Sequence, residues 1–225
     1  METIFDQEIL GTRQHFIKFE LPETWYIHNK AELLYDATLG FRDKIGFRLG
    51  FAFPFFTPNA NLEPSQLIEL PLIIMDAAIW TWLKLTEASA LQTILKIRDI
   101  IKQSHGLLTI LWHQCVLKMK GGRIYEDLIK NLVNESVYTA TGAEIAKWWS
   151  DRNDFQVNIT LNNNEISVLL HNPRKIKNLG IVIRTKKKNE IISTSSNLNV
   201  VEKSDSILKI TFIEGASGKL LLKSM

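Results

Sequence analysis

Over residues 1–150, the pattern of apolar and polar positions shows strand-like segments that alternate with helical ones. Residues 12–16 are a candidate strand, the apolar runs at 68–75 and 107–112 are typical of strands, and the last is apolar on both faces, as in a parallel sheet covered by helices. Residues 86–104 instead carry apolar side chains at helical spacing, with Gly106 just beyond them. Strands that alternate with helices predict an α/β fold for this part.

After residue 152 the pattern changes to period two. Apolar residues at 155, 157, 159 and 161 alternate with polar ones, and further strand-like runs follow at 166–170, 181–185, 207–212 and 219–222. We therefore predict an α/β domain over residues 1–150 and a small antiparallel, sandwich-like β domain over 151–225. Thr141 and Glu144 have capping-box spacing and predict a helix start. That helix ends in Trp148 and Trp149, which we expect at the domain junction, with sugar stacking as the alternative.

Composition narrows the class of protein. The net charge of +3 is unevenly placed, with −2 over residues 1–150 and +5 over 151–225. The basic run 184–188 lacks interleaved aromatic residues and is typical of a solvated turn, so we expect no nucleic-acid partner. The single cysteine, Cys115, cannot form an intrachain disulfide, and we expect it to pack as a small apolar residue. No secretory h-region or apolar run of about 20 residues is present, which favours a cytoplasmic protein without a membrane span.

His113 is the most informative candidate for chemistry. It ends the apolar run 107–112, and side chains at the carboxyl end of a strand in an α/β sheet face the pocket. The alternative is a core or loop histidine bonded to a backbone carbonyl. Arg13, Asp36, Arg48 and Asp76 also stand among apolar neighbours, where an unpaired charge is costly. They should line a cavity or be paired, and a structural pair between Arg48 and Asp36 or Asp76 is the simpler reading.

Six short segments match, in order, the motifs of one enzyme family. They are Arg13-Gln-His-Phe, Tyr35-Asp36-Ala-Thr-Leu-Gly, Gly46-Phe-Arg48-Leu-Gly-Phe-Ala-Phe-Pro54, Glu69-Leu-Pro71, Asp76 and Leu111-Trp-His113. In this order, over residues 9–152, they resemble the polysaccharide deacetylases of carbohydrate esterase family 4, especially a nodulation-factor-deacetylase-like subgroup linked to surface polysaccharides. The resemblance implies a distorted (β/α) barrel for this part and does not cover the β domain.

The resemblance also implies roles for individual residues. Family members bind a divalent metal, usually zinc, through one Asp and two His. A further Asp acts as the general base and a further His as the general acid. Carried over, His113 would be the acid, Asp76 would support it, and Arg13 would orient the base. The expected substrate-binding residues are Arg48, Trp112, Asp36 and His15.

The first two family motifs, with the base and the metal ligands, do not occur in this sequence. Only twelve residues precede Arg13, and His15, His28, His105 and His171 show no ligand-pair spacing, so we assign no metal site. A barrel needs about 200 residues or more. We therefore expect an incomplete barrel. Either the chain is the carboxyl part of a longer enzyme, and a missing amino-terminal portion or another subunit completes the barrel, or the chain is a degenerate relative.

Two functions follow from these observations. The first is hydrolysis of N-acetyl groups on a surface polysaccharide or its precursor. Because the metal-binding motifs are missing, this chain is either active in that reaction or an inactive relative. The alternative is a non-catalytic carbohydrate-binding or assembly module. It would use an aromatic pocket formed by Phe47, Phe51, Phe53, Phe55 and Trp112.

Overall fold

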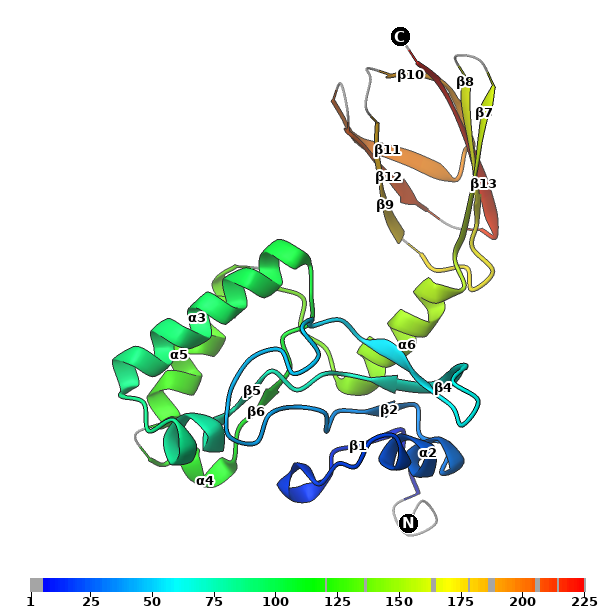
Figure 1. Ribbon diagram of the computed structural model, residues 1–225. Coiled ribbons are helices and arrows are strands. Elements are labelled where there is room, and N and C mark those ends of the chain that lie inside the picture. Colours follow the sequence, from blue (N-terminus) through cyan, green and yellow to red (C-terminus); the bar gives the residue numbers. More distant parts are fainter. Residues whose placement is uncertain are drawn as a thin grey trace. The chain divides into compact units, whose positions relative to one another are not determined.

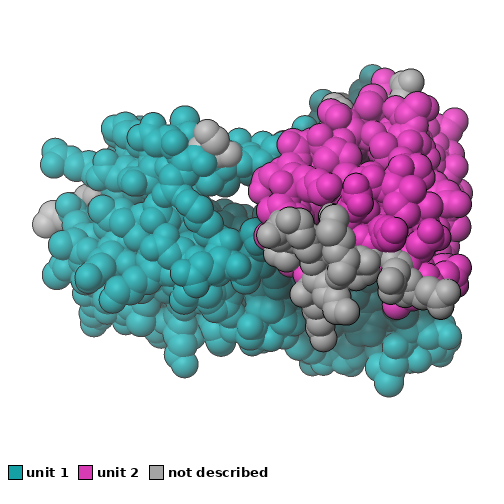
Figure 2. Space-filling model, turned by 90° about the horizontal axis from the view of Figure 1, so that it is seen from above, with its two compact units in different colours: residues 1–147 teal, residues 148–225 magenta. Residues whose placement is uncertain are grey.

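The computed structural model describes residues 6–119, 121–135, 137–162, 165–177, 179–185, 189–204, 207–213 and 215–224 (Figure 1). The chain divides into two compact units, residues 1–147 and 148–225, which Figure 2 colours separately. Lys186, Lys187 and Lys188, the centre of the basic run, lie outside the described residues.

The first unit is a mixed α/β structure. One sheet has the order β1-β2-β4-β3, made of β1 (Gly11–Thr12), β2 (Tyr35–Asp36), β4 (Pro64–Glu69) and β3 (Phe55–Pro58). β1, β2 and β4 are parallel, and β3 is antiparallel to β4. A second, parallel pair consists of β5 (Ile74–Met75) and β6 (Ile110–Leu111). These described strands do not close into a barrel.

The predicted strands are longer than those observed. The run 12–16 forms strand only at its start, because a 3-10 turn follows at His15–Ile17. The run 68–75 is split between β4 and β5, which belong to different sheets. Residues 70–75 are all buried although most of them are not in a strand. An apolar run predicts that a segment is buried, but it does not tell whether that segment is a strand or a loop between strands.

Helices form the rest of the first unit. They are α2 (Glu23–Lys30), a π-helical turn at Ala78–Trp82, α3 (Glu87–Ser104), α4 (Gln114–Leu117) and α5 (Gly121–Asn134). The helix predicted over residues 86–104 is confirmed as α3, and the Thr86 hydroxyl at its start accepts a bond of 3.2 Å from the Ser89 N–H. The predicted stripe of α3 is buried and packs with α5 and β5. Its core comprises Ile74, Ala90, Ile94, Ile97, Ile101, Ile124 and Leu128.

The second unit begins within α6 (Gly142–Asn153). The capping box of this helix is confirmed, because Glu144 accepts from the Thr141 N–H at 2.7 Å and returns its own N–H to Thr141 Oγ1 at 3.3 Å. The guanidinium of Arg152 lies over the rings of Trp148 and Trp149, 5.7 and 4.8 Å from their centres.

Two antiparallel sheets make the rest of this unit sandwich-like. The first has the order β10-β13-β8-β7, from β10 (Asn189–Thr194), β13 (Ser217–Ser224), β8 (Glu165–His171) and β7 (Gln156–Asn162). The second is β11-β12-β9, from β11 (Leu198–Lys203), β12 (Ile207–Phe212) and β9 (Leu179–Arg184). Their core contains Val168, Leu170, Leu208, Ile210, Phe212, Leu220 and Leu222. The sequence did not predict β10 and β11, which alternate less regularly.

No helix among the described residues combines the length and apolar character needed to cross a membrane.

Candidate functional site: two histidine–carboxylate pairs

His113 and Asp76 form a pair at the ends of two neighbouring strands. β5 and β6 are parallel, with Met75 opposite Leu111, so the residues that follow them lie at the same edge. Asp76 Oδ1 is 2.7 Å from His113 Nδ1, and Asp76 Oδ2 accepts the His113 backbone N–H at 2.7 Å. Asp76 Oδ1 also accepts the Ala77 N–H at 2.6 Å. The carboxylate therefore fixes both the backbone and the ring of His113.

Exposure differs sharply within this pair. The Asp76 side chain is fully buried, whereas that of His113 is 47% exposed. No hydrogen bond of the described residues uses Nε2 of His113, so this nitrogen is available to a bound molecule. A buried carboxylate behind a half-exposed imidazole can support proton transfer at Nε2. The partner of His113 is thus a carboxylate and not a backbone carbonyl.

A second histidine–carboxylate pair joins His28 of α2 to Asp36 of β2. His28 Nδ1 is 2.9 Å from Asp36 Oδ2, and both side chains are buried. Gln14 Nε2 lies 2.8 Å from His28 Nε2, and the Thr38 N–H and hydroxyl both donate to Asp36 Oδ1. Asp36 is therefore bonded at both oxygens and has no exposed surface.

Glu69 lies beside Asp36, because the parallel register places the two residues opposite each other. Its carboxyl group is fully buried, and it accepts the Trp25 indole N–H at 2.8 Å and the Leu39 N–H at 3.0 Å. Burial, reinforced by the nearby charge of Asp36, raises the pKa of Glu69 to about 8. Glu69 therefore holds a proton at neutral pH.

Arg13 completes this second cluster. Its Nε donates to the Ala37 carbonyl at 2.9 Å. Burial lowers the pKa of Arg13, while Tyr35, Asp36 and Glu69 oppose that shift. Arg13 has no ion pair within 4.0 Å among the described residues, so its charge is balanced only by more distant groups. A half-buried guanidinium without an ion-pair partner among the described residues is a candidate anion-binding group.

A pocket of about 400 Å³ lies next to Arg13, between β1 and the segment that leads into β6. A Cβ added at Gly11 or Gly142 would lie 2.2 or 2.6 Å from the Tyr35 ring, so both glycines make room for that ring. The buried hydroxyl of Thr109 has no hydrogen-bond partner in the described structure. The lining residues include Gly11, Arg13, Tyr35, Leu108, Thr109 and Gly142.

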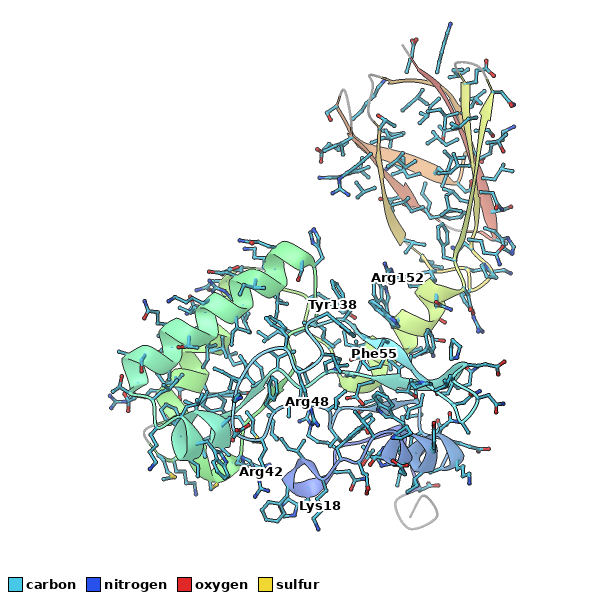
Figure 3. The ribbon with its side chains drawn as sticks, viewed as in Figure 1. Lys18, Arg42, Arg48, Phe55, Tyr138 and Arg152 are labelled. Atoms are coloured by element: carbon cyan, nitrogen blue, oxygen red, sulfur yellow. The ribbon has the colours of Figure 1, made fainter. Side chains whose placement is uncertain are left out.

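The remaining predicted site residues lie elsewhere. Arg48, which is labelled in Figure 3, donates to the Gly40 carbonyl at 2.9 Å. Among the described residues it forms no ion pair with Asp36 or Asp76, so the predicted structural pair is wrong. Trp112 packs against Trp80 and Tyr125, with ring centres 6.5 and 5.4 Å away. His15 is exposed in the turn after β1.

The structure thus unites the predicted residues in two groups. Asp76 and His113 form one, and Arg13 and Asp36 belong to the other. Among the described residues no hydrogen bond or ion pair links Arg13 with Asp76 or His113, and the pocket lining includes Arg13 but neither member of that pair. The five aromatic residues expected in one pocket are absent from this lining. Phe47 and Trp112 pack against one core, and Phe55 against another.

Sequence reasoning missed His28, Trp25 and the buried state of Glu69. Glu69 had a signal, since it is the one acid directly before the apolar run 70–75. Its bond to Trp25 spans 44 positions and had no signal in the sequence. His28 pairs with a carboxylate eight positions away, a spacing that is common by chance.

Metal-binding groups are not found in the described part of the chain, because no three or more of its His, Cys, Asp or Glu side chains are grouped to hold an ion. The side chains present therefore do not fit the metal of the resembled family.

Comparisons with family models, with curated proteins and with solved structures find no match.

Proposed function

We propose that residues 1–147 form a polysaccharide deacetylase-like unit that acts on N-acetyl groups of a surface polysaccharide or its precursor. The observation that carries this proposal is the pair of Asp76 and His113, bonded at 2.7 Å, with a buried carboxylate and a half-exposed imidazole. The order of sequence motifs around these two residues supports it.

His113 has a defined role in this reaction. Hydrolysis of an N-acetyl group transfers a hydroxyl from water to the acetyl carbon and a proton to the nitrogen as the C–N bond breaks. In our proposal His113 Nε2 supplies that proton and is reprotonated by the proton that the attacking water loses, while Asp76 holds the ring in position through Nδ1. Because the described side chains do not fit the family's metal, we derive no step through zinc or another divalent ion.

We further propose that the first unit is an incomplete (β/α) barrel with its gap at the pocket. Thr12 O accepts from Ala37 N, so Gly11 and Arg13 on either side of Thr12 turn their backbone groups away from β2. The backbone oxygen of Thr109 accepts from the N–H groups of Ile73 and Ile74. Leu108 and Ile110, on either side of Thr109, therefore turn their backbone groups away from β5.

Both free edges border the pocket, since Gly11, Arg13, Leu108 and Ile110 all line it. By the alternation of a parallel ladder, the backbone groups of Gly11, Arg13 and Ile110 turn away from the neighbouring strands. A further strand supplied to this gap would extend both sheets and place its carboxyl end near Arg13. This supports the interpretation of the unit as the carboxyl part of a barrel.

Acetate release from N-acetylated oligosaccharides, measured with and without added zinc, tests the proposed activity. Any acetate release by the wild-type chain should depend on His113, so His113→Gln should lower the rate by about 100-fold or more, because general acid catalysis contributes roughly 10²–10⁴-fold. His171→Gln, an exposed histidine of β8, is the matched control. Equal rates for the wild type and His113→Gln would refute the role of His113.

A non-catalytic carbohydrate-binding or assembly module is the second candidate. The absence of a metal-binding group among the described side chains favours it. Calorimetric binding of the same oligosaccharides that is unchanged by EDTA, without acetate release, would support this module. Stoichiometric zinc in the purified protein, found by elemental analysis, would contradict it.

A further inference from the structure

β7 is an edge strand whose apolar side chains are not covered. Along β7, Val157, Ile159 and Leu161 are 47%, 61% and 70% exposed. Each lies opposite a β8 residue that faces the sandwich core, namely Leu170, Val168 and Ile166. They therefore share the inner face of a four-stranded sheet, and the opposing described sheet has only three strands. The period-two pattern predicted the strand correctly, but its apolar side lies beyond the core.

The other edges of this unit are protected in the usual ways, by charges or by irregular pairing. β10 carries Glu190 and a break in register, and β11 carries Glu202 and Lys203 with another break. β9 pairs in unbroken register and carries a charge only at its end, Arg184. β7 has neither device. Its seven residues carry no charge and pair with β8 in unbroken register. The edge of β7 is thus regular, neutral and apolar on one side.

The sequence of β7 is also complementary to itself. Gln156-Val-Asn-Ile-Thr-Leu-Asn162 reads apolar–polar–apolar outward from Ile159 in both directions. A two-fold axis at Ile159 would place Val157 opposite Leu161 of another copy and Asn158 opposite Thr160. All apolar side chains would then lie on one face, and no like charges would meet.

We propose that β7 is a homodimerisation edge, at which two copies of this chain pair antiparallel about Ile159 to join their four-stranded sheets into one. Every second residue of β7 turns its N–H and C=O away from β8, and the second copy satisfies these groups. The same pairing brings the uncovered valine, isoleucine and leucine side chains of both copies together. This inference is independent of the proposed enzymatic function.

Sedimentation or light scattering over a range of protein concentrations tests the dimer. The wild type should approach twice its monomer mass of 25.8 kDa as concentration rises. Ile159→Lys should shift dissociation to at least 10-fold higher concentration, because it places two ammonium groups opposite each other. Val182→Lys is the matched control, since Val182 of β9 is also apolar and 45% exposed. A monomer at all concentrations, or equal dimerisation of both variants, would overturn the proposal.

Disulfide trapping tests the register. In a Cys115→Ser background, Ile159→Cys should form a covalent dimer on oxidation, because residue 159 pairs with itself across the axis. Thr160→Cys should not, since its partner is Asn158 and its side chain lies on the other face.

Thermal unfolding separates these effects from misfolding. If Ile159→Lys lowers the unfolding temperature of the monomer without changing the mass distribution, the residue is covered by its own chain and the proposal fails.

Discussion

Asp76→Asn tests whether the buried carboxylate organises His113. Asp76 accepts three hydrogen bonds, from the His113 N–H, the His113 ring and the Ala77 N–H. An amide keeps one acceptor oxygen and turns an NH₂ group toward a donor. A buried donor without an acceptor costs about 1–3 kcal/mol, and the loss of a charged acceptor adds a similar amount. We expect a loss of about 2–6 kcal/mol in the free energy of unfolding of the first unit.

Urea unfolding followed by tryptophan fluorescence measures this loss, since Trp25, Trp80, Trp82 and Trp112 lie in residues 1–147. Asp43→Asn is the matched control, because Asp43 is exposed and its replacement should change the free energy by less than about 0.5 kcal/mol. If Asp76→Asn were as stable as Asp43→Asn, the carboxylate would not be holding the histidine, and the reasoning about the pair would be wrong.

Three further predictions concern other parts of the chain. Because burial and Asp36 raise the pKa of Glu69 from 4.5 to about 8, the folded chain retains a proton that the unfolded chain releases, so the free energy of unfolding should fall as pH rises from about 4.5 to 8. Glu69→Gln should flatten that slope in denaturation curves recorded across this range, and an unchanged slope would assign it to other groups. Phe212→Ala should destabilise the second unit by about 3–5 kcal/mol in calorimetry, because Phe212 is fully buried in its core. Thr141→Ala should cost about 1 kcal/mol in thermal unfolding through loss of the capping bond to Glu144, and an unchanged stability would show that this cap is not needed.

Local patterns in the sequence predicted the elements whose cause is local. The apolar stripe of α3, the capping box of α6 and the two-residue period of β7 and β8 each depend on residues a few positions apart. The pairing of Asp76 with His113 was implied by the family resemblance, and the structure has the two residues at the carboxyl ends of neighbouring parallel strands.

Only the tertiary structure decided which distant groups meet and which apolar residues are covered. The contact between Trp25 and Glu69 depends on how α2 packs on β4, and no local pattern encodes it. The apolar run 68–75 is buried throughout, but the sheet to which each part belongs is fixed by pairing with β2 and β6. In β7, the sequence specified the alternation, whereas the width of the opposing sheet left the apolar side exposed. Burial is a property of the surrounding layers, so a strand's own sequence cannot determine it.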